Sequence, residues 1–207
     1  MGKVFVDIGM SLDGFIAGPN GRPGNPLGDG GLAIHQWVFP LASFRELMGM
    51  AGGDINRDDE IVRAVFARAG AYVMGRRMFE EGEVGWPSNP PFRAPVFVLT
   101  HHRREPWARE GGTTFFFVTD GIDAALERAR EAAGGKDVRI SGGANTVQQF
   151  LRAGVVDELT IHLAPVLLGT GVKAFDDLGP QHAALERLGV IDSPRVTHLS
   201  YRVTRKS

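Results

Sequence analysis

The stretch V-R-I-S-G-G-A-N-T-V-Q-Q-F-L, residues 138–151, joins an apolar strand pattern to a helical pattern with almost no spacer. Its junction holds two consecutive glycines, Gly142 and Gly143. A tight turn needs at most one residue at positive φ, so the second glycine needs another reason. A helix N-terminus carries unpaired N–H groups and a partial positive charge, which can bind phosphate where no side chain covers the backbone. The junction is therefore either a phosphate site or only a tight strand-to-helix turn.

Strand and helix patterns alternate on both sides of this stretch. Short apolar runs predict strands, and apolar residues at helical spacing predict helices. The predicted strands are 3–9, 71–74, 96–100, 114–118, 137–140 and 157–163, and the predicted helices are 32–48 interrupted at Pro40, 58–69, 77–81, 122–133 and 144–153. Two last strands, 183–191 and 195–203, are separated by a short turn and should pair antiparallel. We predict an α/β fold with a mostly parallel twisted sheet and an antiparallel C-terminal edge.

Caps and breakers divide these elements. Asn56 or Asp58 is expected to cap the helix that follows it, and Asp120 is expected to cap the helix at 122–133. Residues 18–31 contain six glycines and three prolines, which predicts a loop. We expect a single domain over residues 1–207 with a loop-rich insert at about 21–56.

The composition excludes several classes of function. The chain has 207 residues, a net charge of −1 and no cysteine, so disulfides and thiol catalysis are excluded. The near-zero charge argues against a nucleic-acid partner, and no apolar run is long enough for a membrane span. The N-terminus lacks a signal-peptide pattern, so we expect a cytoplasmic protein. A metal site would depend on histidines and carboxylates, and none of the six histidines shows paired metal spacing, so no metal is expected.

Three loops with glycine or polar residues follow predicted buried strands. They contain Gly75 and Arg76, then Thr100 to Arg103, and then Ser141 to Thr146. Ligands of open α/β sheets bind beyond the carboxyl ends of the strands. Each of the first two loops alone is more simply a solvated basic turn, and the third alone is equally well a tight strand-to-helix turn. Together the three predict a groove for a dinucleotide with an additional phosphate, although the G-x-G-x-x-G fingerprint is absent.

The remaining polar residues carry weaker signals. His162 and His198 alternate within predicted strands and are interpreted as ordinary sheet residues. The serines at 11, 141 and 193 lack the G-x-S-x-G pattern of a nucleophile elbow.

Five segments in order resemble the dihydrofolate-reductase-like family. They are V-D-I-G-M-S-L-D-G-F-I-A at 6–17, Y-V-M-G-R-R-M-F at 72–79, V-F-V-L-T at 96–100, I-S-G-G-A-N-T-V-Q-Q-F-L at 140–151 and D-E-L-T-I-H-L-A-P-V-L-L-G-T-G at 157–171. More closely, the chain resembles the reductase domain of bacterial bifunctional riboflavin-biosynthesis deaminase-reductases and its stand-alone relatives. The resemblance implies a three-layer fold, a homodimer, and NADPH lying across the strand ends.

The resemblance also implies a role for each matching segment. The pyrophosphate would contact the strand-to-helix junction, at Ser141, Gly142, Gly143, Ala144, Asn145 and Thr146. Gly75 and Arg76 would lie at the adenosine-side phosphates. The adenine and its 2′-phosphate would be flanked by Leu99, Thr100 and Arg103. The nicotinamide would approach Ile16 and Ala17, and the site would be closed by Gly169, Thr170 and Gly171.

The chain departs from dihydrofolate reductases at the substrate. Those enzymes place a carboxylate on the helix after the first loop, whereas the corresponding region here offers only Glu46, beyond Pro40. Dihydrofolate is therefore not the expected substrate. Asp13 is the acidic candidate near the reacting carbon, or else only braces its loop. Trp37 either walls the substrate pocket or belongs to the core.

Two functions follow from this sequence, with a third less supported. The first is an NADPH-dependent reductase of a small pterin-like, ribosylaminopyrimidine-like or carbonyl substrate. The second is an NADP-binding module without turnover, which the lack of an obvious proton donor favours. The third is a methyltransferase-like or flavodoxin-like binder. No zinc deaminase signature is present.

Overall fold

A nine-stranded sheet forms the centre of the protein in the computed structural model, which describes residues 2–179 and 183–204. The strand order is β10-β11-β8-β1-β7-β3-β4-β6-β5. These strands are β1 (Val4–Ser11), β3 (Ala69–Gly75), β4 (Val96–Leu99), β5 (Trp107–Ala108), β6 (Thr114–Val118), β7 (Asp137–Gly142), β8 (Glu158–Ala164), β10 (Ala184–Ser193) and β11 (Val196–Thr204). A separate pair joins β2 (Phe15–Ala17) to β9 (Val172–Lys173).

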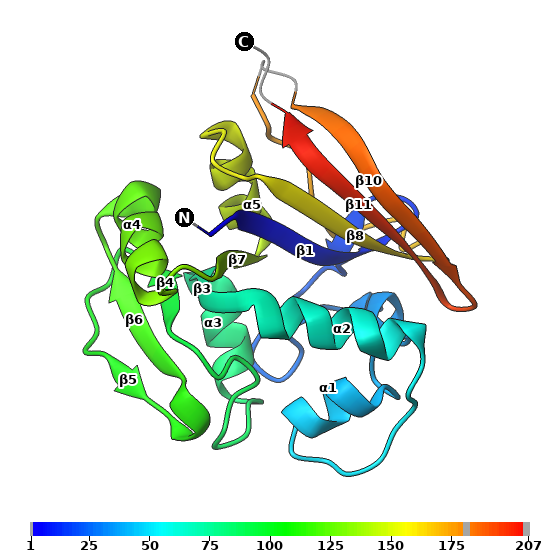
Figure 1. The fold of residues 1–207 in the computed structure, drawn as a ribbon, viewed down its shortest axis with the longest axis horizontal. Coiled ribbons are helices and arrows are strands. Elements are labelled where there is room, and N and C mark those ends of the chain that lie inside the picture. The colour runs from blue at the N-terminus through cyan, green and yellow to red at the C-terminus, as the bar shows by residue number, and fades with distance from the viewer. Residues whose placement is uncertain (1, 180–182, 205–207) are drawn as a thin grey trace.

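The central strands are parallel and both edges are antiparallel. Strands β8, β1, β7, β3, β4 and β6 pair in parallel, whereas β11 pairs antiparallel with β8 and β10 pairs antiparallel with β11. Strand β5 adds an antiparallel pair at the other edge. The predicted mostly parallel sheet with an antiparallel C-terminal edge is confirmed, and Figure 1 shows the long C-terminal hairpin at that edge.

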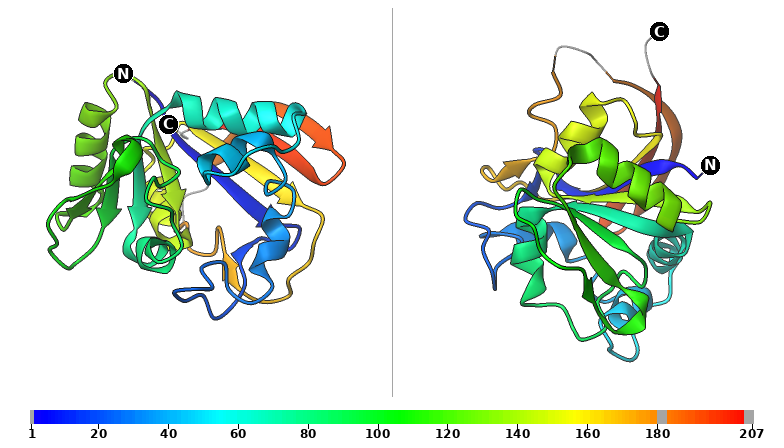
Figure 2. Two further views of the ribbon diagram at one scale, coloured as in Figure 1. Left: turned by 90° about the horizontal axis from the view of Figure 1, so that it is seen from below. Right: turned by 90° about the vertical axis from the view of Figure 1, so that its left-hand side faces the viewer.

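Helices cover both faces of the sheet, which makes three layers. The helices are η1 (Gly31–His35), α1 (Ala42–Leu47), α2 (Arg57–Arg68), α3 (Arg76–Glu83), η2 (Glu110–Gly112), α4 (Gly121–Ala132) and α5 (Ala144–Arg152). The side chains of α4 and α5 pack on one face with Val4, Val6 and Ile8 of β1. Those of α2 and α3 pack on the other face with Phe5 of the same strand. This alternation follows the two-residue period of a strand, and Figure 2 shows the sheet between its helices.

One predicted helix is divided in the structure, and the others lie within a few residues of their predicted bounds. The predicted helix at 32–48 is two short helices, η1 and α1, because Pro40 lies between them. Asn56 caps α2 as predicted, since its Oδ1 accepts the Asp59 N–H at 3.0 Å. Asp120 occupies the N-cap position of α4 as predicted, but its side chain accepts no hydrogen bond from the helix.

The insert at about 21–56 packs against the C-terminal half of the sheet. Trp37 and Leu41 are buried with Val62 of α2 and Val196 of β11. The insert therefore forms a wall beside β1 and β8 on the face that also carries α2. That residues 1–207 form one domain stays a prediction. No helix within the described residues has the length and apolar character needed to cross a bilayer.

Candidate functional site

A cavity of about 980 Å³ opens at the carboxyl ends of the parallel strands. Its wall includes the last residue of β3, Gly75, and those of β4 and β7, Leu99 and Gly142. This is the edge at which ligands of open α/β sheets bind. The cavity has a glycine-rich half beside α5 and an aromatic half beside α2 and the insert.

Most of the residues expected to hold a cofactor line this cavity. They are Ile16, Ala17, Gly75, Arg76, Leu99, Thr100, Ser141, Gly142, Gly143, Ala144, Asn145 and Thr146. The segments come from β2, β3, β4 and the β7–α5 junction, so the fold brings the three predicted loops to one place. Gly171 of the β8–β9 connection and Lys173 of β9 join them.

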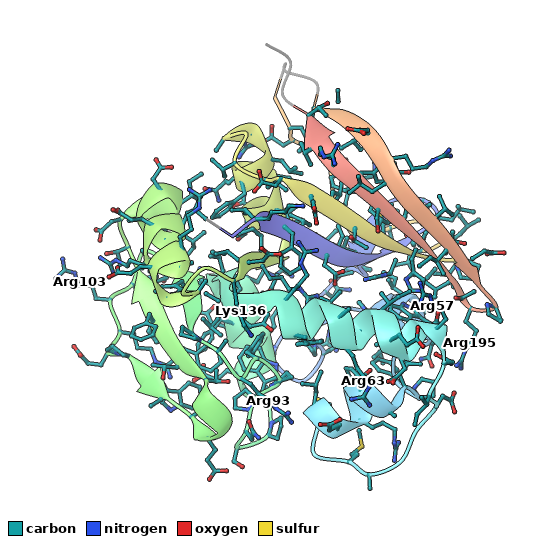
Figure 3. All side chains as sticks on the ribbon, viewed as in Figure 1. Arg57, Arg63, Arg93, Arg103, Lys136 and Arg195 are labelled. Carbon is teal, nitrogen blue, oxygen red and sulfur yellow. The ribbon has the colours of Figure 1, made fainter. Side chains whose placement is uncertain are left out.

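Three expected cofactor residues lie outside the cavity wall. Arg103 is exposed and projects from the edge of the molecule in Figure 3, because the chain turns outward after β4. Gly169 and Thr170 belong to an exposed turn, and only Gly171 from that turn reaches the cavity. The structure therefore does not bring these three residues to the groove with the others.

The two junction glycines keep the backbone bare for different reasons. Gly142 has φ +123°, a conformation that side chains rarely adopt. Gly143 has an ordinary φ of −70°, and a Cβ there would meet no atom within 4 Å. Packing therefore does not require glycine at 143. The peptide bond between them is cis.

Two neighbours of the junction also point to a bound group. The Ser141 Oγ is buried without a hydrogen-bond partner among the described residues. Gly75 lets β3 approach α5, since a Cβ there would lie 2.5 Å from the Thr146 Oγ1. The first amides of α5 have no partner within the helix. An anionic group on this junction would receive several main-chain donors and one hydroxyl.

Asp13 braces a loop and does not line the cavity. Its carboxylate accepts the Ser11 hydroxyl at 2.6 Å and the Gly169 amide at 2.7 Å, and the Leu168 amide is 3.1 Å away. The Ser11 hydrogen bond, together with the amides, lowers the pKa of Asp13 to about 2 although partial burial opposes this. Asp13 is thus a carboxylate near neutral pH, and its oxygens are committed to the loop.

The aromatic half of the cavity has apolar walls and a charged floor. Its apolar walls are Trp37, Val38, Phe44, Val62, Val65 and Phe66. Its polar residues are Asp7, His35, Arg139 and His162. Trp37 is buried and lines the cavity, and its ring lies 5.0 Å from that of His162. A flat aromatic molecule would fit such walls.

A continuous chain of buried hydrogen bonds starts at this floor. Arg139 Nη2 donates to Asp7 Oδ1 at 2.8 Å, and Asp7 Oδ2 lies 3.0 Å from His162 Nε2. His162 Nδ1 is 2.6 Å from His198 Nδ1. His198 Nε2 is 3.1 Å from Asp58 Oδ1, which also accepts the Ser193 hydroxyl at 2.5 Å.

The interpretation of His162 and His198 as ordinary sheet residues was wrong. The two face each other directly across the β8–β11 pair, and both are buried. The sequence did contain an indication of this buried cluster. Asp7 and Arg139 each occupy the middle of an apolar strand, where an unpaired charge would be costly. Their pairing with one another and with His162 depends on strand order, which alternation alone does not reveal.

The charges of this floor shift the pKa values of its acids and bases. Burial opposes the charge of Asp7, but His162 and Arg139 outweigh it and lower the pKa of Asp7 to about 2. Burial and the nearby charge of His162 lower the pKa of His35 to about 4. Burial also lowers the pKa of His198, and the hydrogen bond to Asp58 offsets this only in part. Within the described residues, no group of three or more potential ligands is arranged to hold a metal ion.

Comparison with known proteins agrees with this geometry. Residues 2–199 match the family described as the RibD C-terminal domain. The uncharacterized protein YyaP of Bacillus subtilis (strain 168) is 25% identical over 184 residues, which cover 85% of this chain and 81% of YyaP.

Two solved structures show the same fold. A protein from Shewanella sp. PV-4, provisionally assigned to riboflavin biosynthesis, has a TM-score of 0.68 at 24% identity and covers 98% of this chain and 99% of its own. Dihydrofolate reductase from Enterococcus faecalis, in complex with NADP(H), has a TM-score of 0.53 at 12% identity, with 98% and 97% of the chains covered. The resemblance and the dihydrofolate-reductase-like fold predicted from the sequence are confirmed, and the chain belongs to the RibD C-terminal domain family.

Proposed function

We propose that this protein is an NADPH-dependent reductase of a small, flat substrate. The observation that carries the proposal is one continuous cavity with a side-chain-free helix N-terminus at one end and an aromatic, charged pocket at the other. Membership of a reductase-domain family supports it. The E. faecalis structure binds NADP(H) on the same fold.

The residues present fit a dinucleotide phosphate. The unpartnered Ser141 hydroxyl and the bare backbone at Gly142 and Gly143 match the pyrophosphate, and Thr146 adds a second hydroxyl. Gly75 and Arg76 would hold the adenosine-side phosphates, with Leu99 and Thr100 beside the adenine. Ile16 and Ala17 would contact the nicotinamide. A reduced nicotinamide supplies hydride, and the chain supplies position and electrostatics.

The substrate pocket favours a heterocycle with hydrogen-bond acceptors. Trp37 Nε1 and Arg139 Nε are buried at the wall without partners among the described residues, so both can donate to a substrate. Asp7 supplies an acceptor. A pterin-like or ribosylaminopyrimidine-like ring carries both kinds of group and would stack on the aromatic walls, and a carbonyl compound would use the two donors.

This proposal is tested by measuring NADPH oxidation with a panel of pterins, ribosylaminopyrimidines and quinones. A titration measures NADPH binding in parallel. Turnover of any panel member is the expected result. Tight NADPH binding without turnover on every member would instead support the alternative of an NADP-binding module. A preference for S-adenosylmethionine or FMN over NADPH would contradict both.

Arg76 provides a separate test of the extra phosphate. Arg76 lines the cavity, and its only described ion pair is an exposed one with Glu80 at 3.1 Å. Arg76→Ala should weaken NADPH about 10-fold or more through loss of a charge-assisted hydrogen bond and should weaken NADH much less. Arg57→Ala is the control, because it removes another exposed helical ion pair, with Glu60, away from the cavity. Equal losses for NADPH and NADH would contradict the assignment.

A further inference from the structure

We propose that His162 and His198 share one buried proton, which keeps His162 an imidazolium and makes it the acid of the cavity. This inference rests on the proposed function for its catalytic meaning, although the proton itself does not depend on turnover. It answers a gap in the site, since Asp13 is committed to its loop and the cavity carboxylates Glu81 and Asp176 are paired with Arg77 and Lys173.

The hydrogen-bond geometry favours a shared proton. A neutral imidazole has one N–H and one bare nitrogen. Asp7 is a carboxylate, so the His162 Nε2 at 3.0 Å must be the donor. If the Asp58 Oδ1 also accepts, the His198 Nε2 is a donor as well. Both Nδ1 atoms would then be bare and facing at 2.6 Å, which is repulsive unless a third proton lies between them.

The charges of the cluster balance when that proton is present. Asp7 and Asp58 supply two negative charges, and Arg139 and the histidine pair supply two positive charges. Buried charges persist only when they are paired and hydrogen-bonded. A neutral histidine pair would leave one net negative charge in the interior.

The excess proton belongs to His162 more than to His198. His162 touches the carboxylate of Asp7, whose second oxygen binds Arg139. His198 has the lower affinity for a proton, since burial and the charge of its neighbour outweigh Asp58. His198 is then neutral, with Nε2–H fixed on Asp58 and its Nδ1 lone pair accepting from His162.

The other titratable groups around the pair do not compete for the role. His35 of η1 lines the cavity, but its lowered pKa leaves it neutral near pH 7. Burial raises the pKa of Tyr72 of β3, whose hydroxyl has no hydrogen-bond partner among the described residues, and Tyr72 does not line the cavity. Arg139 keeps its proton. Among the described residues packed around the pair, His162 is the titratable group that contacts the cavity carboxylate of Asp7.

Delivery of this proton to the substrate takes two successive transfers. The N–H bond at His162 Nε2 breaks as an O–H bond forms at Asp7 Oδ2, and that O–H bond breaks as the substrate nitrogen or oxygen is protonated. That atom takes the electron pair of the double bond whose carbon receives hydride. His162 is left neutral with its Nδ1–H still on His198, so no ring must turn. Water restores the proton after the product leaves.

Side-chain ¹⁵N NMR of the free protein tests the shared proton without any substrate. We expect His162 to show two protonated nitrogens near neutral pH, His198 to show one, and a coupling across the Nδ1–Nδ1 bond. His198→Leu removes the acceptor of the His162 Nδ1–H, so His162 should lose its extra proton at a lower pH than in the wild-type protein. His198→Gln retains an amide oxygen as acceptor and should restore the imidazolium. Two neutral histidines in the wild-type protein would overturn the proposal.

Steady-state kinetics with any panel substrate that the protein reduces test the proton transfer to the substrate. His162→Gln should lower kcat about 100-fold or more, the range of general acid catalysis, and leave NADPH binding unchanged. Asp7→Asn should lower kcat to a similar extent. If that variant does not fold, His162→Gln alone tests the proton transfer. His102→Gln, at an exposed position outside the cavity, is the control. A kcat for His162→Gln equal to that control would overturn the role of His162 as acid.

The two failures can be told apart. An intact NMR signature without turnover on any substrate contradicts the reductase and leaves the shared proton established. Turnover in the wild-type protein with two neutral histidines contradicts the shared proton and leaves the reductase established.

Discussion

At the scale of single residues, Gly142 and Gly143 are adjacent but have different requirements. Gly142 has φ +123°, which only glycine adopts readily, so its identity serves the backbone. Gly143 has an ordinary φ, lines the cavity, and would accept a Cβ with no atom within 4 Å. The absence of a side chain at 143 therefore serves a ligand more than the fold.

Gly143→Val should separate binding from stability. The variant is expected to change the free energy of unfolding by less than about 1 kcal/mol, because valine tolerates this backbone and glycine costs entropy in the unfolded chain. NADPH binding should be lost, since the side chain takes the volume of the phosphate. Urea denaturation and a fluorescence titration measure the two effects.

Gly142→Ala is the matched control at the neighbouring position. It forces a side chain to positive φ and should destabilise the protein by about 1–3 kcal/mol. NADPH binding to Gly143→Val with unchanged affinity would show that the pyrophosphate does not lie on this junction.

Residue-level patterns predicted the glycine-rich half of the cavity better than the charged floor of its aromatic half. The ends of the predicted strands can be recognised from short apolar runs in the sequence. Gly142, Gly143 and Arg76 lie shortly after such ends. Asp7 and His162 are 155 residues apart, and His198 lies 36 residues further along. Their contact depends on β8 lying between β1 and β11, which hydrophobic periodicity does not encode.

At the scale of elements, the N-terminus of α2 joins three parts of the molecule. Asn56 caps the helix, and Asp59 accepts the Ser43 amide of α1 at 2.6 Å. Asp58 binds His198 and Ser193 of the C-terminal hairpin. The first turn of α2 thus fixes both the insert and the outer end of the buried hydrogen-bond chain.

Asn56→Ala should lower the free energy of unfolding by about 1 kcal/mol, the usual cost of a lost N-cap. Asp120→Ala is the control, because Asp120 occupies an N-cap position without a side-chain hydrogen bond to its helix. Its effect should be about 0.5 kcal/mol or less, from the helix dipole and an exposed contact with Arg128. Chemical denaturation measures both, and equal losses would contradict the capping argument.

The existence of most elements could be predicted from the sequence, because strands and helices here have clear periods. The central strands are short apolar runs, and α4 shows its Ala125, Leu126 and Ala129 face plainly. Pro40 indicated a break within 32–48. The sequence did not indicate that the two parts form the separate short helices η1 and α1. The buried contacts of Trp37 and Leu41 with α2 and β11, which hold that segment, are tertiary.

At the scale of the whole molecule, acid should destabilise the fold in two steps. The pKa of His35 falls from 6.5 to about 4 in the folded protein, so the unfolded chain binds more protons between these values. The free energy of unfolding therefore decreases as pH falls from 6.5 towards 4. The pKa of Asp7 falls from 3.8 to about 2, which adds a second decrease over that lower window.

Urea denaturation over a pH series measures these steps. His35→Gln cannot titrate and should flatten the decrease between pH 6.5 and 4 while leaving the lower step in place. The same slope in the variant and the wild-type protein would show that His35 is not held neutral by burial.

We propose that the whole molecule is a homodimer that uses the sheet edge formed by β10. Leu185, Leu188 and Val190 of this strand are between 45% and 49% exposed, a concentration of apolar surface on a strand whose one partner in the described part of the chain is β11. Edge strands present unpaired backbone groups as well, and a second copy would cover both. Figure 1 shows this edge on the outside of the molecule, away from α4.

Light scattering on the wild-type protein should give a mass of about twice 22.4 kDa. Leu188→Lys and Val190→Lys place charges on the proposed interface and should give monomers that still bind NADPH, because β10 contributes no residue to the cavity wall. Leu12→Lys is the control, since Leu12 is 62% exposed but lies outside β10. A dimer that persists in both β10 variants would place the interface elsewhere, and a wild-type monomer would remove the proposal altogether.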